Sequence, residues 1–494
     1  MKKIICIFFT FIVALSTVLF FNSEKNIYGD GLEYLAMSVS FKNHFSPVRT
    51  ISDRNEVKTI LAQNIKFTIN DNALNGGYYK LPERKGVGEC SYHFWAYSLL
   101  VSPFLVLFAN LGKNPIVAFT FVNLLLIILL FGWILFRNSA MDEKNRLFIA
   151  LLTLFSPIWF YFPWTHTEVY TFVLLYIGLL EYYNNRKTSA VIFSSISSLQ
   201  NPAASIVPFF ILVFELVNLI KNKSKDNLIN FIKLSCCSTI VLIPYIFYYV
   251  NYGTPSLIGK YATDTSSISF AKIMSLFFDL NFGLIIYVPI LIGIIIYLIC
   301  KKDKIAILSA MTVFLFAIID SAQLNWNSGM RLINRYSYWM IPVLIFGCFS
   351  YFVKISDKKR LIILLLTILT ITPWLCCTGK KKAKYHTMFQ PIAKSVLYVM
   401  PSLYTPQEEV FFERCHYNEI PMKDKSGEQL PAVFITKDGY ITKGMFYNKL
   451  KHKYEYFNTP KSFKSNLALI QIKFRHKKNV IIITPVGIEK RKLK

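Results

Sequence analysis

An acidic motif that could perform catalysis follows the first apolar segment of the chain. Residues 28–34 read Tyr-Gly-Asp-Gly-Leu-Glu-Tyr, directly after the apolar residues 4–21. The two glycines that flank Asp30 allow the backbone to turn tightly around it. A carboxylate held there could accept a proton from an acceptor hydroxyl, and Glu33 is the alternative base one helical turn on. The competing interpretation is that Asp30 only caps the helix that begins at Gly31, because Asp is a favoured N-cap residue.

Two arginines in a second polar segment could bind phosphate. Arg331 and Arg335 are four residues apart within residues 320–336, so in a helix they would share one face. A guanidinium group suits phosphate because it donates two hydrogen bonds at once. The alternative is an interfacial belt of arginines with Trp326. Arginines on the outer side of a membrane run against the usual charge bias, so we favour phosphate binding.

Further polar residues of the same predicted face are weaker candidates. Lys260 is a candidate for donor phosphate binding, and the candidate substrate contacts are His93, His166, Glu168, Asp279, Asn325 and Tyr336. For His166 and Glu168, helix capping by Thr165 or Thr167 explains the polar residues equally well. The sequence shows no spacing typical of a metal site, so the cofactor is unknown and a divalent metal is left open.

The elements that must position these residues are membrane helices. The chain has 494 residues, of which 54% are hydrophobic and 17% are charged. A soluble protein would have roughly a quarter charged residues. The apolar residues form blocks of the length that a helix needs to cross a bilayer, which is about 20 residues. We therefore predict a polytopic α-helical membrane protein.

The net charge of +27 does not indicate nucleic-acid binding. Many basic residues lie in short clusters between apolar blocks, as expected for residues that set membrane topology. The others lie mainly after residue 377, where an excess of basic residues suits anionic lipid or polymer. We predict contacts with membrane lipids and no nucleic-acid partner.

The positions of the basic linkers predict the topology. We interpret residues 4–21 as an uncleaved first span with a cytoplasmic N-terminus, since no small-residue cleavage site follows. The later apolar blocks are 94–111, 115–136, 147–162, 167–183, 188–200, 203–220, 228–250, 282–300, 305–320, 336–353 and 361–377. If all of them crossed, the basic linkers after residue 136 would face outward, against the positive-inside bias. We therefore expect 94–111 to lie along the outer interface, which leaves about 11 transmembrane helices.

This topology gives a transmembrane domain, residues 1–377, whose first outer loop spans about residues 22–114. Residues 378–494 are expected to form a small α+β or β-rich domain outside the membrane. Residues 432–436, 467–474 and 479–484 are strand-like, and Asp438-Gly439 favours a hairpin turn. Cys90 and Cys415 are the two cysteines in clearly polar segments, and their pairing is left open.

The acidic motif after the first span, the large first outer loop and the many spans resemble the GT-C superfamily of membrane glycosyltransferases. The nearest branches are the polyprenyl-phosphate-sugar-dependent enzymes, such as protein O-mannosyltransferases and aminoarabinose transferases. Asp30 matches the catalytic aspartate of the first loop, and residues 93–103 are similar to the stretch that carries a His-Pro-Pro-Leu-like motif. Residues 326–336 and 340–342 are similar to a Trp-Gly-Arg-Tyr-Pro stretch. The resemblance covers about residues 1–350.

Two departures from the family pattern are present. The family usually has two adjacent acids in the first loop, whereas Gly31 and Leu32 separate Asp30 from Glu33. Its second span often opens with an arginine, which residues 114–130 lack. Phosphate binding would then fall to the later arginines.

The resemblance implies an inverting transfer of a hexose or pentose from a polyprenyl-phosphate donor. The acceptor would be a glycan, lipid or protein on the extracytoplasmic face of the cell (inner) membrane, with Asp30 as general base. The C-terminal domain would lie on the same side. The alternatives are a flippase or transporter for a lipid-linked sugar, and an O-antigen-type polymerase or ligase.

Overall fold

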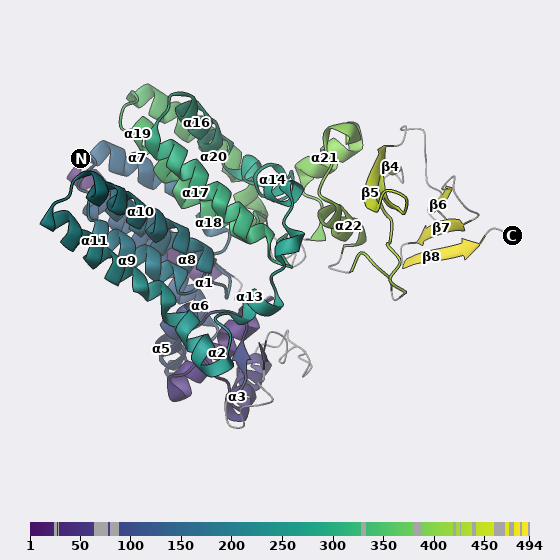
Figure 1. The fold of residues 1–494 in the computed structure, drawn as a ribbon, viewed down its shortest axis with the longest axis horizontal. Helices are drawn as coiled ribbons and strands as arrows, with labels where there is room; N and C mark the ends of the chain where they lie inside the picture. Colours follow the sequence, from purple (N-terminus) through teal and green to yellow (C-terminus); the bar gives the residue numbers. More distant parts are fainter. Residues whose placement is uncertain are drawn as a thin grey trace. The chain divides into compact units, whose positions relative to one another are not determined.

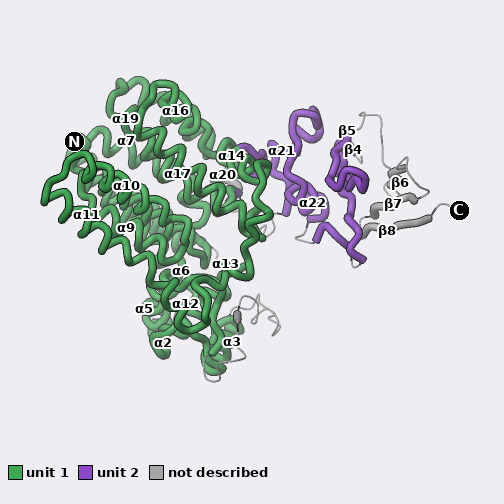
Figure 2. Tube along the Cα trace, in the orientation of Figure 1, with its two compact units in different colours: residues 1–277, 283–329, 333–380 green, residues 278–282, 330–332, 381–494 purple. Residues whose placement is uncertain are grey.

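In the computed structural model (Figure 1), the chain forms two compact units, which have different colours in Figure 2. Unit 1 contains residues 1–277, 283–329 and 333–380, and unit 2 contains residues 278–282, 330–332 and 381–494. The residues that the structure describes are 1–23, 27, 29–63, 78–79, 88–327, 332–378, 387–417, 421–424, 426–436, 441–458, 470–473, 479–484 and 487–492.

Unit 1 is a helical bundle (Figure 1). Its helices are α1 (Lys2–Asn22), α2 (Gly31–His44), α3 (Ile51–Ala62), α5 (Ala96–Asn110), α6 (Val117–Gly132), α7 (Glu143–Leu154), α8 (Glu168–Tyr183), α9 (Lys187–Ser198), α10 (Ile206–Lys221), α11 (Lys225–Ser238), α12 (Ile243–Tyr252), α13 (Leu257–Tyr261), α14 (Phe270–Phe278), α15 (Leu284–Tyr287), α16 (Pro289–Cys300), α17 (Lys304–Ser321), α18 (Arg335–Gly347), α19 (Phe349–Phe352) and α20 (Asp357–Thr378). The short strands β1 (Tyr78–Tyr79) and β2 (Cys90–Ser91) pair antiparallel.

Several helices of unit 1 are apolar enough to cross a membrane. Among the described residues, five helical segments have the required length and composition: Lys2–Asn22, Val117–Arg137, Pro202–Lys221, Lys225–Tyr252 and Lys304–Ser321. Ala96–Asn110 and Pro289–Cys300 are apolar but shorter. The chain is therefore compatible with a multi-pass membrane protein. The expected count of about 11 spans is not evident from these helices and stays a prediction.

The helix expected at residues 94–111 is α5, and it is short for a span. Its 15 residues give it a length of about 22 Å. The hydrocarbon core of a bilayer is about 30 Å thick. Helices α7, α16 and α18 lie in blocks that are predicted to cross and are shorter still, with 12, 12 and 13 residues. The length of α5 therefore does not test its position, and the interfacial helix stays a prediction.

Helix α2 begins at Gly31 as the acidic motif predicts, but its surroundings differ from the prediction. Leu32, Leu35, Ala36 and Val39 follow one another at helical spacing, which predicts an amphipathic helix that lies on the membrane interface. Instead every side chain from Glu33 to Phe41 is buried, because α3 and α5 pack against α2. The residues on the side predicted to be polar, such as Ser38 and Ser40, bond the carbonyl groups of Tyr34 and Ala36. The helix is an internal support rather than a surface element.

Helices α8 and α18 form the centre of unit 1. All residues of α18 and the residues from Glu168 to Glu181 of α8 are buried. Helices that are apolar on all sides are typically surrounded by others, as here. The two helices pack together, and the Tyr161 hydroxyl donates to the Ile333 carbonyl oxygen at 2.8 Å just before α18 begins. The starts of α8 and α18 therefore lie at the same end of the bundle.

Unit 2 is a small α+β unit, as the sequence predicts for the C-terminal region. It contains α21 (Pro391–Val399), α22 (Glu408–His416), β3 (Ala432–Ile435), β4 (Ile441–Asn448), β5 (Lys453–Asn458), β6 (Ile470–Lys473), β7 (Asn479–Thr484) and β8 (Gly487–Lys492). Two antiparallel sheets have the orders β3-β4-β5 and β6-β7-β8. Strands β3, β6 and β7 correspond to the three predicted strands. The predicted turn at Asp438-Gly439 lies outside the described residues.

The core of unit 2 joins its helices to its first sheet. Phe389, Leu397 and Phe411 pack with Phe434 of β3 and Met445 of β4, and all five are buried. Cys90 of unit 1 and Cys415 of unit 2 are both free cysteines.

Candidate functional site

The Asp30 side chain does not cap α2. Asp30 occupies the N-cap position, but its side chain makes no capping hydrogen bond. The carboxylate Oδ2 instead accepts a hydrogen bond from Arg335 Nη1 at 2.7 Å. Gly29 has a φ of +50°, and a Cβ on Gly31 would overlap the Thr165 hydroxyl. Both glycines are thus needed where the sequence predicts a tight turn, and the turn leaves Asp30 available for contacts in space.

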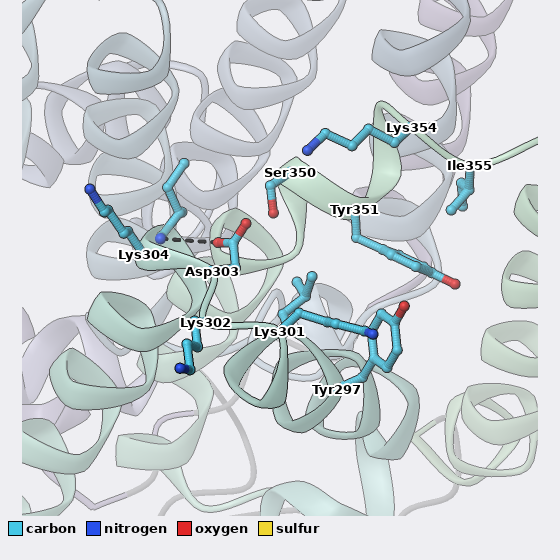
Figure 3. A pocket seen from close by; sticks show the side chains of 11 residues that line it. Tyr297, Lys301, Lys302, Asp303, Lys304, Ser350, Tyr351, Lys354 and Ile355 are labelled. Atoms are coloured by element: carbon cyan, nitrogen blue, oxygen red, sulfur yellow. Dashed lines mark hydrogen bonds between the residues drawn. The ribbon is translucent and has the colours of Figure 1, made fainter.

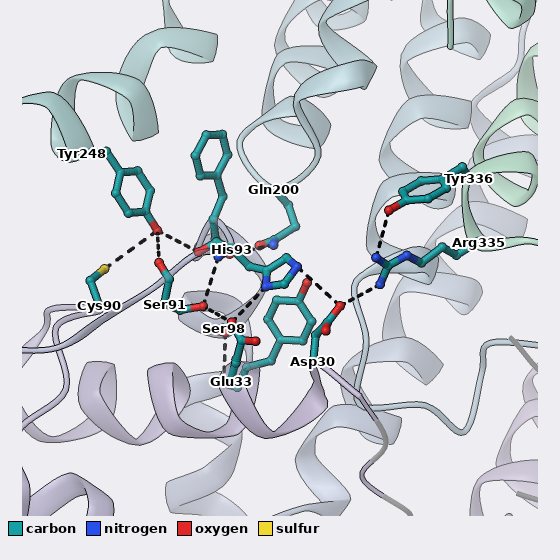
Figure 4. Close-up of polar contacts among 12 residues, drawn as sticks. Asp30, Glu33, Cys90, Ser91, His93, Ser98, Gln200, Tyr248, Arg335 and Tyr336 are labelled. Atoms are coloured by element: carbon teal, nitrogen blue, oxygen red, sulfur yellow. Dashed lines mark hydrogen bonds and ion pairs between the residues drawn. The ribbon is translucent and has the colours of Figure 1, made fainter. Parts of the chain in front are cut away.

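His93 connects the two acids of the motif (Figure 4). Its Nδ1 lies 2.9 Å from Glu33 Oε2, and its Nε2 lies 3.4 Å from Asp30 Oδ2. One imidazole ring thus bridges two acids that are three residues apart in the chain. Asp30, Glu33, His93 and Arg335 are called the acid–histidine–arginine cluster below.

Several residues that the sequence analysis did not single out hold His93 in place (Figure 4). The Ser91 hydroxyl bonds Glu33 Oε2 and accepts from the His93 backbone N–H at 3.1 Å. The Tyr248 hydroxyl of α12 lies 2.7 Å from the His93 carbonyl oxygen. Gln200 donates from Nε2 to the Phe94 carbonyl oxygen at 2.7 Å. Sequence spacing does not identify these contacts, because Ser91 and Glu33 are 58 residues apart. Gln200 and Tyr248 lie more than a hundred residues from the residues that they bond.

Arg335 is the first residue of α18. Asn334 caps the helix, since its Oδ1 accepts from the backbone N–H groups of Tyr336 and Ser337. The guanidinium group also donates from Nη2 to the Tyr336 hydroxyl at 2.9 Å. A cation in the first turn of a helix is disfavoured by the helix dipole. The contact with Asp30 offsets that cost, which indicates a specific role for the positive charge at this place.

The charges of the cluster shift the pKa values of its members in opposite directions. Burial would raise the pKa of Asp30, but the positive charges of His93 and Arg335 outweigh it and hold this pKa below its usual range. Burial raises the pKa of Glu33 despite the neighbouring His93. Burial would lower the pKa of His93, but Glu33 and Asp30 raise it to about 9. At neutral pH, Asp30 is therefore ionised and His93 is protonated.

Access to the cluster differs between its members. The side chain of Asp30 is 25% exposed, against 18% for His93 and 11% for Arg335. Asp30 is therefore the member that an incoming substrate reaches most easily.

His166 and Glu168 lie beside the cluster, at the start of α8. The ring of Tyr34 lies between them and the cluster, 5.5 Å from the His166 ring and 5.6 Å from the His93 ring. His166 Nδ1 lies 3.6 Å from Glu168 Oε2, and both side chains are buried. The alternative prediction of helix capping by Thr167 is wrong, because Thr167 makes no side-chain cap bond. Both residues are thus neighbours of the site.

A group of buried polar atoms lies around the loop between α17 and α18. Asp320 and Asn327 are 2% and 3% exposed. Within the part of the chain that the structure describes, Asp320 Oδ2, both amide atoms of Asn327 and Arg335 Nε have no hydrogen-bond partner. Asn334 Nδ2 donates to the Trp326 carbonyl oxygen at 2.9 Å, which ties this loop to the start of α18. Buried polar atoms without partners are costly, so such a group is a candidate ligand contact.

Other predicted site residues are not brought to the cluster by the structure. Lys260 is exposed on α13, where its ammonium group lies 5.2 Å from the centre of the Tyr261 ring. Asn325 is exposed in the loop after α17. Tyr336 is buried and contacts Arg335. Only Tyr336 of these three has a contact within the cluster.

Asp279 belongs to unit 2 and has a structural role there. Its carboxylate accepts hydrogen bonds from the Tyr404 hydroxyl and the Asn281 backbone N–H, both at 2.7 Å. Asn281 Oδ1 in turn accepts from the Gln390 backbone N–H. These bonds hold residues 278–282 against the C-terminal part of unit 2.

The predicted pairing of the two arginines on one helical face is wrong. Helix α18 begins at Arg335 and residues 332–334 are not helical, because Asn334 takes the N-cap position. Arg331 itself lies outside the described residues. Of the predicted phosphate ligands, Arg335 therefore has the strongest structural support.

The cluster also contains a set of atoms that could bind a metal. Among the described residues, the ligand atoms of Asp30, Glu33 and His93 lie within 4.8 Å of one another. Two carboxylates and an imidazole are a donor set that divalent metals accept. Asp30 Oδ2 accepts a hydrogen bond from Arg335, so an ion at this oxygen would lie beside one fixed positive charge. A metal ion would also need the neutral form of His93, so these three side chains could hold an ion only in place of the proton on His93.

No protein-family model, curated protein or solved structure matches this chain.

Proposed function

We propose that this chain is a membrane glycosyltransferase that transfers a sugar from a polyprenyl-phosphate donor to an acceptor hydroxyl. The observation that carries the proposal is the contact between Asp30 and Arg335 within one partly exposed cluster. A general base and a phosphate ligand are the two groups that such a transfer requires. The proposed base, Asp30, comes from the segment after the first apolar helix, and the proposed phosphate ligand, Arg335, comes from the start of α18. The resemblance to GT-C enzymes implies the same two roles.

In the proposed reaction, the acceptor oxygen attacks the anomeric carbon of the donor sugar. The bond between that carbon and the phosphate oxygen breaks, and polyprenyl phosphate leaves with the electron pair. The acceptor proton passes to Asp30, which becomes a neutral carboxylic acid. Arg335 stabilises the negative charge that develops on the leaving phosphate. A single displacement inverts the configuration at the anomeric carbon.

The Asp30–Arg335 pair couples donor binding to activation of the base. While Arg335 contacts Asp30, the carboxylate has a low proton affinity, since its pKa lies below the usual range. A donor phosphate that draws Arg335 away removes one of the positive charges that lower this pKa. The proton affinity of Asp30 then rises. In this proposal, Asp30 becomes an effective base when the donor is in place.

The buried polar atoms at the loop between α17 and α18 are proposed as sugar contacts. Asp320 Oδ2 and the amide group of Asn327 have no protein partner among the described residues. Sugar hydroxyl groups both donate and accept, so they could satisfy a carboxylate and an amide together. His166 and Glu168, whose buried side chains lie on the other side of the Tyr34 ring from His93, are proposed as neighbours that fix the cluster.

The orientation of the site follows from the predicted topology. With a cytoplasmic N-terminus, the starts of α8 and α18 face outward, and so does the residue that follows α1. We therefore propose an extracytoplasmic site on a bundle of about 11 spans in the cell membrane. The acceptor is a glycan, a lipid or a protein.

Asp30→Asn tests the proposal. The substitution keeps the shape of the side chain but removes proton acceptance at neutral pH. General-base contributions are typically about a hundred- to ten-thousandfold, so release of polyprenyl phosphate from labelled hexose and pentose donors should fall by that factor. Asp264→Asn is the control, because Asp264 is an acid that bonds Ser266 in a loop between α13 and α14.

An active Asp30→Asn protein would contradict the assignment of the base. Wild-type protein that moves the donor across vesicle membranes without transferring sugar would favour the flippase alternative instead.

A further inference from the structure

A basic pocket lies around the start of α17 (Figure 3). The other end of this helix carries Asp320, whose carboxylate feels the charge of Arg335 in the acid–histidine–arginine cluster. The pocket has a volume of about 690 Å³ and is formed by the end of α16, the turn between α16 and α17, and α19 with the segment that follows it. The residues that line it are Tyr297, Leu298, Lys301, Lys302, Asp303, Lys304, Ile305, Ser350, Tyr351, Lys354 and Ile355. No residue of the proposed active site belongs to it.

The pocket has an uncompensated positive charge. Four lysines line the pocket, Lys301, Lys302, Lys304 and Lys354, together with one acid, Asp303. Asp303 is already engaged, since its Oδ1 accepts from the backbone N–H groups of Ile305 and Ala306, both at 3.0 Å. In the described part of the chain, none of the four lysines lies in an ion pair with an acidic side chain. An anion that enters the pocket would therefore not displace an existing salt bridge.

The backbone fixes the positions of these lysines. Lys302 adopts a φ of +58°, which makes a tight turn between α16 and α17. The Lys301 backbone N–H bonds the Tyr297 carbonyl oxygen, and the Asp303 N–H bonds that of Leu298. The rings of Tyr297 and Tyr351 meet edge to face at 5.9 Å, which joins the two walls of the pocket. The basic groups thus stand on a rigid frame.

A polar atom without a protein partner also lines the pocket. Ser350 Oγ is buried and has no hydrogen-bond partner among the described residues. Leu298, Ile305 and Ile355 give the pocket an apolar part beside its lysines. The pocket therefore offers cations, a hydroxyl and apolar surface together, as a phospholipid headgroup and the start of its acyl chains require.

The position of the pocket fits a membrane surface. Helix α17 is a candidate span of 18 residues, so its two ends lie about 27 Å apart. This distance is close to the hydrocarbon thickness of a bilayer, about 30 Å. Tyrosines are enriched at the level of lipid headgroups, and basic pockets between spans bind anionic headgroups on the cytoplasmic side.

We propose that this pocket binds the phosphate headgroup of an anionic phospholipid at the membrane surface opposite to the cluster. The inference does not depend on the proposed glycosyl transfer. The simpler explanation is that these lysines only set the topology, which requires positive charge but no defined pocket.

The experiment compares the whole protein in nanodiscs made of phosphatidylcholine with or without phosphatidylglycerol. The pocket variant is Lys302→Gln with Lys354→Gln, and the control is Lys223→Gln with Lys225→Gln, which removes the same charge from the basic linker between α10 and α11. We expect phosphatidylglycerol to raise the unfolding temperature of the wild type and the control. Retention of this lipid in native mass spectrometry should fall about tenfold or more in the pocket variant alone.

Equal retention in both variants would overturn the proposal and leave the lysines as determinants of topology. Inorganic pyrophosphate is the soluble probe. If it raises the unfolding temperature in phosphatidylcholine nanodiscs as much as the lipid does, the ligand is a free phosphate compound and the lipid assignment is wrong.

Discussion

Arg335 contacts a carboxylate that the proposed reaction needs as a base. The guanidinium group lies 2.7 Å from Asp30 and 2.9 Å from the Tyr336 hydroxyl, so it is held in a fixed orientation. The planar guanidinium group can make the same charge-assisted hydrogen bonds to a phosphate as it makes to a carboxylate. In the proposed reaction, the same residue first keeps the proton affinity of Asp30 low and later binds the donor phosphate.

Two substitutions of Arg335 distinguish the effect of its positive charge from the effect of its paired hydrogen-bond donors. Arg335→Lys keeps the positive charge but loses the two-pronged geometry, whereas Arg335→Ala loses both. A charge-assisted hydrogen bond is worth roughly 1.5–3 kcal/mol, so Arg335→Ala should weaken transfer about tenfold or more, and Arg335→Lys should restore only part of it. Steady-state transfer rates at several donor concentrations measure this. Full activity of Arg335→Ala would exclude a role for this arginine in catalysis.

The raised pKa of His93 predicts that stability falls at alkaline pH. The charged groups that face His93 are Asp30, Glu33 and Arg335, and the two acids raise its pKa from 6.5 to about 9. A raised pKa in the folded state means that protonated His93 stabilises the fold fully below pH 6.5. This contribution is lost as the pH rises to about 9 and beyond.

Thermal unfolding of the wild type and of His93→Gln between pH 6 and about 9.5 measures this contribution. The difference between the two unfolding temperatures should shrink as the pH rises. A constant difference over this range would contradict the proposed charge state of His93.

At the scale of elements, the packing between Gly31 and Thr165 sets where α2 begins. A Cβ at Gly31 would overlap the Thr165 hydroxyl, whereas no atom lies within 4 Å of a Cβ at Gly293 in α16. Overpacking typically costs about 1–3 kcal/mol. Gly31→Ala should therefore lower the unfolding temperature and shift Asp30, so transfer should fall too. The control Gly293→Ala should change neither the unfolding temperature nor the transfer rate. If the two substitutions have equal effects, the close approach of Thr165 to Gly31 is tolerated and the prediction is wrong.

The sequence predicts the elements of the site better than their contacts. The glycines around Asp30 and the apolar blocks identify the turn, the start of α2 and the helices of unit 1. They do not reveal that His93 bridges Asp30 and Glu33, because sixty residues separate His93 from Glu33. The predicted face for Arg331 and Arg335 fails for a local reason, since Asn334 starts the helix. Periodicity also suggested one buried face for α2, but burial depends on the neighbouring helices α3 and α5.

At the scale of the whole molecule, the direction in which the bundle crosses the membrane decides which side the cluster faces. In a variant without native cysteines, Ala109→Cys at the end of α5 and Ala140→Cys before α7 should be labelled from opposite sides. Both positions are exposed. We expect a membrane-impermeant maleimide to label Ala109→Cys in intact cells and Ala140→Cys only after permeabilisation. Labelling of Ala140→Cys in intact cells would reverse the orientation and with it the extracytoplasmic site.

The contact between Asp30 and Arg335 joins residues that are 305 positions apart in the chain. Ribosomes extend a chain at roughly 5–20 residues per second, so Asp30 is made about 15–60 s before its partner. During this interval the nascent chain contains the acids and His93 but lacks the arginine of the cluster. The cluster is therefore completed only after most of the bundle has been synthesised, and a chain that terminates before α18 could not assemble it.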